Sequence, residues 1–232
     1  MKLIRTPGKG IGQRLLIREE EFESIAIEAL EEVRLLPHGP GPVRIDDFVE
    51  RYFQLTVGYE DLPPGVLGAT GFRSDGTVES ITVAEKLADD RYIHLFRSTL
   101  AHEAGHGLLH RPLFSMAPSD ELIAVENFDS QKRRILCRES DLKADGKSGY
   151  DGRWWEYQAN RMIGTLLLPK PAVMEALRPC LDTRLITGLP YLKDDRRPEA
   201  IARVAADFTV STMVAKIRLD GLFPPNHGQI EF

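Results

Sequence analysis

The stretch His102-Glu103-Ala104-Gly105-His106 places two imidazoles four residues apart, with a carboxylate beside the first. Positions i and i+4 of an α-helix share one face, so both histidines can bind the same metal ion. Glu103 can then reach a water molecule on that metal, which makes it the candidate catalytic residue of a zinc hydrolase. The plainer alternative is a helix whose histidines merely pack or face solvent. Because the chain has only six histidines in 232 residues, the pattern is expected by chance only about 0.01 times, and the metal site is favoured.

The residues around this motif predict that it lies within a helix. Asp90–Ala101 contains neither proline nor glycine, and it starts with an aspartate, a residue that often caps helices. Apolar residues on both sides of the motif offer a face for burial, namely Leu95, Phe96, Leu100, Leu108 and Leu109.

A zinc hydrolase needs a third protein ligand, and a second predicted helix offers one. This helix covers Trp154–Pro169 and is closed by its proline. Its predicted core side consists of Met162, Ile163, Leu166 and Leu167. Glu156 is the candidate ligand, Asn160 one turn later is a plausible supporting partner, and Ala159 is small enough to let two helices approach closely. From spacing alone, Glu156 could equally be an ordinary solvated helix carboxylate.

Three blocks of the chain resemble the ImmA/IrrE family of metallo-endopeptidases: Arg97–His110, Glu156–Pro169 and Phe208–Leu222. The resemblance implies a zincin-like fold and a protein substrate, commonly a helix-turn-helix repressor whose cleavage switches genes on in stress, mobile-element or toxin–antitoxin control. Two features depart from the commoner pattern. A long polar segment over residues 111–152 is typical of a lid or a substrate-selective flap, and Arg161–Gly164 differs in residues that concern core packing.

The same resemblance implies a role for each candidate site residue. His102, His106 and Glu156 would hold one Zn²⁺ per chain, and Glu103 would be the catalytic carboxylate. The expected reaction is amide hydrolysis, in which Glu103 takes a proton from water and passes it to the leaving amine. Two other classes stay open, a non-proteolytic zinc-containing protein that regulates a repressor by binding it, and an interaction protein whose C-terminal helices carry the function.

Composition indicates a globular cytoplasmic protein. The chain is 42% hydrophobic and 28% charged, with a net charge of −5, so it lacks the basic surface expected of a protein that binds nucleic acid directly. Neither a signal-peptide core nor an apolar run of about 18 residues is present, and no membrane partner is expected.

The remaining candidate side chains receive lesser roles. Cys137 and Cys180 are expected to be reduced thiols, with Cys137 half-buried in a strand and disfavoured as a zinc ligand because no partner shows metal spacing. His110 shares the ligand face but lies a further turn away, which indicates a supporting or core residue. His38, His94 and His227 lack ligand geometry. A donor to the oxyanion is expected, and three tyrosines qualify only by type, namely Tyr92, Tyr150 and Tyr157.

The predicted fold is α+β. A zincin-like core spans residues 1–170, with a small β-sheet over the metal-binding helix and the loop-rich insert at 111–152. We predict helices at Glu19–Leu36 and Ile45–Phe53, a strand-like Leu55–Tyr59, and a hairpin of Val66–Phe72 and Val78–Val83. Val78–Val83 or its neighbour is the candidate edge strand for a bound peptide, although a plain structural hairpin is an equal alternative.

Residues 171–232 are predicted to form a helical C-terminal part. Its helices are expected at Ala172–Arg178, Pro198–Phe208 and Ser211–Leu219, and the last two resemble a helix-turn-helix. Lys216 and Arg218 are the only nearby cations on the second helix, too few to dominate contacts with phosphates. Substrate recognition or core packing is therefore favoured over DNA binding.

Overall fold

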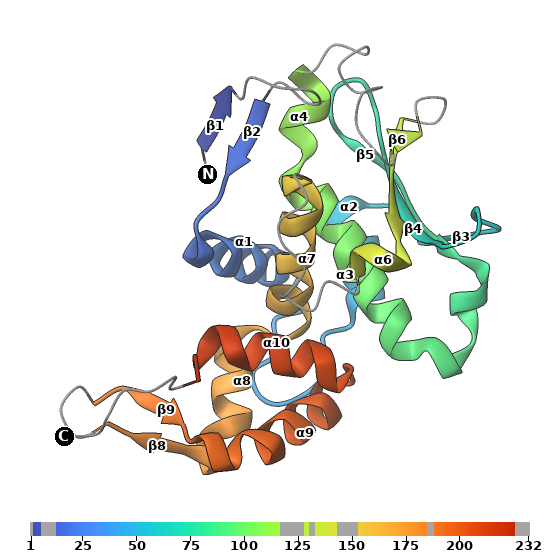
Figure 1. The fold of residues 1–232 in the computed structure, drawn as a ribbon. Helices are drawn as coiled ribbons and strands as arrows, with labels where there is room; N and C mark the ends of the chain where they lie inside the picture. Colours follow the sequence, from blue (N-terminus) through green and yellow to red (C-terminus); the bar gives the residue numbers. More distant parts are fainter. Residues whose placement is uncertain are drawn as a thin grey trace.

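Two helices that lie side by side form the centre of the molecule. The computed structural model describes residues 2–5, 13–116, 128–129, 133–142, 153–184 and 188–225. In Figure 1, α3 (Ile93–Leu109) and α7 (Trp154–Leu167) run through the middle, with a β-sheet on one side and α1 on the other. The described fold is therefore α+β with a small mixed sheet, as predicted.

Helix α3 is buried along the part that contains His102, Glu103 and His106. Every residue from Arg97 to Gly107 is buried, because the sheet covers one side of the helix and α7 the other. The helix follows a short 3₁₀ turn at Asp90–Tyr92. The prediction of Asp90 as the cap was wrong, since Asp89 Oδ1 accepts the Arg91 N–H at 2.9 Å and Asp90 lies inside the turn.

The close approach of α3 and α7 depends on small residues. A Cβ atom built on Gly105 would lie 2.8 Å from Met162 Cβ and 3.2 Å from the Ala159 carbonyl oxygen. Real Cβ atoms almost never make a contact this short, so only glycine fits here without movement of a helix. The prediction that the second helix allows close approach near Ala159 is confirmed, and Gly105 is the residue of α3 that permits it.

The main sheet has the order β3-β5-β4-β7-β6, with β3 parallel to β5 and the other pairs antiparallel. The bounds are β3 Gly58–Glu60, β4 Val66–Phe72, β5 Val78–Ala84, β6 Phe128–Asp129 and β7 Arg134–Arg138. The predicted β4–β5 hairpin is confirmed. Its turn contains Gly76 at φ +82°, a backbone conformation that favours glycine.

The prediction that Val78–Val83 or its neighbour is an edge strand was wrong. Both β5 and β4 are interior, because β3 pairs with β5 and β7 pairs with β4. Residues 111–152 contribute two strands to the sheet, β6 and β7. They also contain the helices α4 (Arg111–Met116) and α6 (Glu139–Leu142). The rest of that segment, including any lid, lies outside the described residues. The predicted strand at Leu55–Tyr59 starts later, at Gly58.

The N-terminal part covers the opposite side of α7. A hairpin of β1 (Lys2–Arg5) and β2 (Gln13–Leu16) leads into α1 (Glu19–Glu32), which packs against α7. Helix α1 ends before the predicted Leu36, because Arg34 adopts a left-handed φ of 58° and the Leu35 N–H bonds back to the Leu30 carbonyl at 2.8 Å. Helix α2 spans Ile45–Phe53, as predicted.

The C-terminal helices gather beneath the central pair (Figure 1). They are α8 (Lys170–Leu177), α9 (Arg197–Phe208) and α10 (Thr212–Leu222), with a small hairpin of β8 (Leu181–Thr183) and β9 (Pro190–Leu192) beyond them. Ser211 caps α10, as predicted, by accepting the Val214 N–H at 3.2 Å. The division into residues 1–170 and 171–232 stays a prediction.

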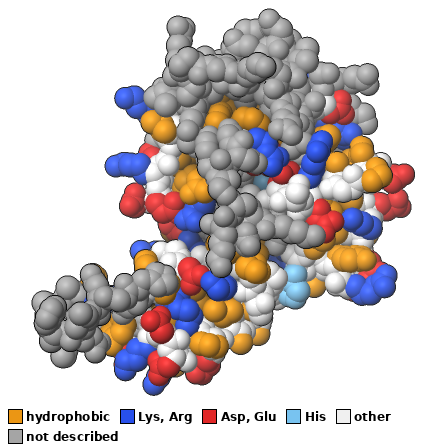
Figure 2. Space-filling view, viewed as in Figure 1, with side chains coloured by type: hydrophobic (Ala, Val, Ile, Leu, Met, Phe, Trp, Pro, Cys, Tyr) orange, Lys and Arg blue, Asp and Glu red, His pale blue; other side chains and the backbone are white. Residues whose placement is uncertain are grey.

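The two cations predicted for the surface of α10 are both engaged within the protein. Arg218 is buried, donates to the Leu168 carbonyl at 3.0 Å and pairs with Glu23, while Lys216 pairs with Asp220 at 2.5 Å. On the face seen in Figure 2, acidic and basic side chains are mixed over the described surface. Along the described residues, no helix has both the length and the apolar character to cross a membrane.

Candidate metal centre

Three side chains from α3 and α7 converge on one point between the helices. His102 Nε2 lies 3.0 Å from His106 Nε2 and 3.1 Å from Glu156 Oε2, and His106 Nε2 lies 3.6 Å from the same carboxylate oxygen. All three residues are buried. The structure thus brings together the three predicted ligands, and Glu156 is not the solvated carboxylate of the alternative interpretation.

The separations and the chemistry of these donors fit a metal ion. Ligands about 2.1 Å from a tetrahedral zinc lie about 3.4 Å from one another, close to the observed 3.0–3.6 Å. The other carboxylate oxygen of Glu156, Oε1, is buried and has no hydrogen-bond partner among the described residues. Because a buried, unpaired carboxylate oxygen is costly, a cation beside it would relieve that cost. His102, His106 and Glu156 can therefore hold a metal ion.

The second ring nitrogen of each candidate ligand histidine also lies within hydrogen-bond distance of a partner. His102 Nδ1 lies 2.9 Å from Asn160 Oδ1, and His106 Nδ1 lies 2.9 Å from His110 Nδ1. Gln158 Oε1 lies 3.2 Å from His110 Nε2 and extends that chain. Such partners fix the tautomer and the orientation of a ligating imidazole. Asn160 and His110 thus contact the candidate ligand histidines, as a supporting role would require, and that role stays a prediction.

Helix α7 supplies the outer part of this network as well. Asn160 Nδ2 donates to the Asp141 carbonyl at 2.8 Å, and Gln158 Nε2 donates to the Leu15 carbonyl at 2.6 Å. Gln158 was not predicted as a site residue. The signal that could have identified Gln158 is its position two residues after Glu156 on the same helix, because a side-chain amide that is buried there needs hydrogen-bond partners.

Glu103 projects from α3 toward strand β4. Its Oε2 accepts a hydrogen bond from the Thr70 hydroxyl at 2.6 Å, while Oε1 is buried without a partner among the described residues. A Cβ atom on Gly68 would lie 2.6 Å from Oε1, so this glycine makes room for the carboxylate. Neither Thr70 nor Gly68 was predicted. A glycine inside a strand often marks such a close approach, which was the signal for Gly68.

Burial dominates the electrostatics of the cluster. It raises the pKa of Glu103 to about 8, against the opposing influence of His102 and Thr70. Burial also acts to raise the pKa of Glu156, but His106 and His102 outweigh it and the pKa is lowered. Burial lowers the pKa of both His106 and His110. These two imidazoles are therefore favoured in the neutral form, which is the form that binds metals.

Cys137 differs from its prediction in two respects. The side chain is fully buried rather than half-buried, because β7 lies inside the sheet between β4 and β6. Its sulfur also lies within 4.8 Å of ligand atoms of His102 and Glu103. The statement that it has no partner at metal spacing was therefore wrong, since the pairing of β7 with β4 was not predicted. Burial raises the pKa of this thiol well above its usual value, and the nearby Glu103 adds to the effect.

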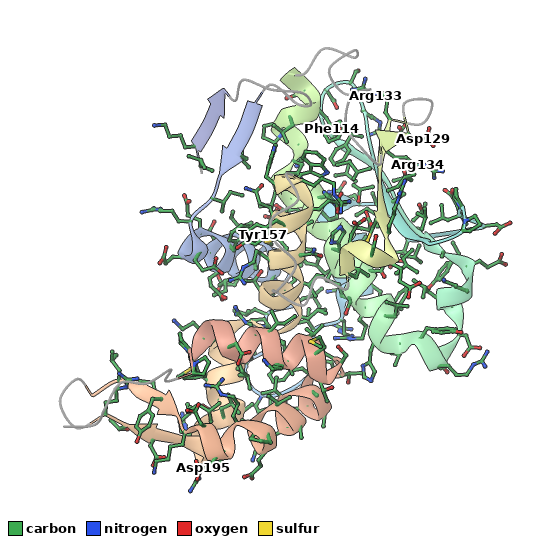
Figure 3. All side chains as sticks on the ribbon, viewed as in Figure 1. Phe114, Asp129, Arg133, Arg134, Tyr157 and Asp195 are labelled. Carbon is green, nitrogen blue, oxygen red and sulfur yellow. The ribbon has the colours of Figure 1, made fainter. Side chains whose placement is uncertain are left out.

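The two described tyrosines among the candidate oxyanion donors are not buried with the cluster. Tyr92 is 40% exposed and Tyr157 is 53% exposed. Tyr157 extends from α7 on the side of α1, away from the sheet (Figure 3). Tyr150 lies outside the described residues. His38 and His94 are exposed, in agreement with their exclusion as ligands, and His227 lies outside the described residues.

Comparison with known proteins adds no assignment to this site. No protein-family model matches the chain, and no curated protein matches it either. The functional interpretation therefore depends on the residues and their geometry, together with the motif resemblance described above.

Proposed function

We propose that this protein is a zinc-dependent endopeptidase with a zincin-like fold, related to the ImmA/IrrE family. The observation that carries the proposal is the convergence of His102 Nε2, His106 Nε2 and Glu156 Oε2 within 3.6 Å of one another, with the carboxylate of Glu103 buried beside them. Two histidines and a carboxylate leave one position of a tetrahedral zinc open, which is typical of catalytic rather than structural sites.

Glu103 performs the proton transfers in this proposal. The Thr70 hydroxyl holds Oε2 at 2.6 Å and leaves Oε1 available. The carboxylate accepts a proton from the attacking water and then delivers it to the leaving amine. Zinc, when bound, supplies Lewis acidity, which polarises the scissile carbonyl and makes water a better nucleophile. The His110 and Asn160 side chains keep both ligand imidazoles oriented during these steps.

The proposed substrate is a protein, and the resemblance favours a helix-turn-helix repressor in the cytoplasm. Binding of that repressor without cleavage is the competing function. The two differ in their dependence on Glu103, because a binding function needs the fold and the metal but no proton acceptor.

Metal content measured by mass spectrometry tests the site first. We expect about one zinc per chain in the wild type and in Glu103→Gln, and little in His106→Ala and Glu156→Ala. A wild-type protein that takes up no metal when zinc is supplied would refute the proposal. Glu103→Gln keeps the shape of the side chain but cannot accept a proton, so it should bind the substrate without cleaving it. Cleavage by this variant at the wild-type rate would remove Glu103 from its catalytic role.

A further inference from the structure

A second group of potential metal ligands overlaps the first. His102, Glu103 and Cys137 each offer a ligand atom, these atoms all lie within 4.8 Å of one another, and all three residues are fully buried. We propose that they form an alternative metal site, here called the Cys137 site, which binds a soft metal ion through a thiolate. The site formed by His102, His106 and Glu156 is called the Glu156 site. The proposal goes beyond the peptidase function and does not require it.

The pairing of two strands places the thiol beside the carboxylate. Cys137 on β7 is the register partner of Gly68 on β4, and Gly68 is the residue whose missing side chain makes room for Glu103 Oε1. The thiol makes a weak contact with the Arg138 carbonyl at 3.8 Å, and a hydrogen bond with the Glu103 carboxylate contributes to its raised pKa. The sulfur and the carboxylate therefore already lie next to each other, and a metal ion bound between them would replace the thiol proton.

His102 cannot bind a metal ion in both sites at the same time. The Nδ1 atom of this imidazole is held by Asn160 at 2.9 Å, which leaves Nε2 as its single donor to a metal. An ion in the Cys137 site uses the Glu103 carboxylate as a ligand. Glu103 can then no longer accept a proton, so we expect this bound form to be inhibited.

The thiolate determines which ions the Cys137 site prefers. Sulfur ligands favour soft ions such as Cd²⁺ and Cu⁺, whereas Mg²⁺ and Mn²⁺ prefer oxygen. When the metal–sulfur bond forms, the thiol proton is released to the solvent. The Glu156 site has only nitrogen and oxygen donors, so a metal bound through sulfur reports on the Cys137 site alone.

Titration of the protein with Cd²⁺ tests this inference, because bonds from thiolate to Cd²⁺ absorb in the ultraviolet. The key variant is Glu156→Ala, which removes the Glu156 site. We expect it to bind about one ion per chain with a thiolate absorption band. Adding Cys137→Ser should abolish both the band and the bound ion, whereas adding Cys180→Ser should change neither. Cys180 is the matched control because it is also a free, buried cysteine.

The outcomes separate this inference from the proposed function. No thiolate band in Glu156→Ala would overturn the Cys137 site and leave the peptidase proposal intact. An unchanged stoichiometry and band in Glu156→Ala, equal to those of the wild type, would support the Cys137 site and count against the Glu156 site. If Cys137→Ser fails to fold, X-ray absorption of Glu156→Ala/Cys180→Ser replaces it, because Cys137 is then the only thiol in the chain. An absence of sulfur around the metal would refute the inference.

Discussion

Replacement of Gly105 by alanine tests whether the separation of α3 and α7 controls the metal centre. The added methyl group would lie 2.8 Å from Met162 Cβ and 3.2 Å from the Ala159 carbonyl oxygen. Neither atom can rotate away, because one is fixed to the backbone and the other belongs to it. The helices must therefore move apart, and overpacking of this kind costs about 1–3 kcal/mol. Helix propensity offsets ~1 kcal/mol of that cost, so we expect a net destabilisation of up to about 2 kcal/mol.

Gly164→Ala is the matched control for this experiment. Gly164 lies inside α7, where a new Cβ atom would meet only Arg218 Cδ at an ordinary 3.5 Å. Helix propensity should then stabilise the protein by about 0.5–1 kcal/mol. For a chain of this length, 1 kcal/mol shifts Tm by about 2–4 °C, so the two variants should shift it in opposite directions when calorimetry is done with a chelator present.

Zinc affinity is the second property to compare between Gly105→Ala and Gly164→Ala. Separation of α3 from α7 moves His102 and His106 away from Glu156, so Gly105→Ala should bind zinc more weakly in competition with a chromophoric chelator, while Gly164→Ala should match the wild type. A Gly105→Ala protein that gains stability and keeps the wild-type affinity would refute the reasoning that glycine is needed for this helix contact.

Three further predictions concern the surroundings of the ligands. Asn160→Ala should weaken zinc binding about 10–100-fold without unfolding the protein, as measured by chelator competition. Gly68→Ala should displace the Glu103 carboxylate, whereas the new methyl group of Gly71→Ala, on the same strand, closely approaches only the Ser80 side chain, which can rotate. Peptidase activity should therefore fall in Gly68→Ala alone. The zinc content should be unchanged in both variants. In the metal-free protein, the raised pKa of about 8 for Glu103 means that the folded state favours its neutral form. The contribution of Glu103 is therefore fully present below the unfolded-state pKa and is lost as pH rises to about 8, so urea unfolding should show the wild type losing about 5 kcal/mol relative to Glu103→Gln between pH 4.5 and about 8. Parallel pH profiles for the two proteins would contradict that assignment.

The candidate metal ligands on each helix could be predicted because they depend on local geometry. His102 and His106 are one helical turn apart, and the sequence around each helix has the apolar pattern and proline signal that define it. Glu156 needed the motif resemblance, since spacing alone did not distinguish a ligand from a solvated carboxylate. The C-terminal end of α1 was missed by a few residues, because a left-handed residue such as Arg34 leaves little signal when it is not glycine. The 3₁₀ turn before α3 was not predicted either.

The residues around Glu103 could not be predicted in the same way, because they depend on pairing between distant strands. Thr70, Gly68 and Cys137 reach the carboxylate only through the order β5-β4-β7. A strand was predicted at Cys137, but its pairing with β4 was not. A shift of one residue in the register of β4 and β7 would turn their side chains to the opposite face of the sheet. The helices therefore bring the candidate metal ligands together, whereas the register of the sheet determines which groups surround the Glu103 carboxylate. We therefore expect substitutions at the contact between α3 and α7 to change the metal affinity. Substitutions in β4 or β7 should change the proton-transfer chemistry of Glu103 and leave the Glu156 site intact.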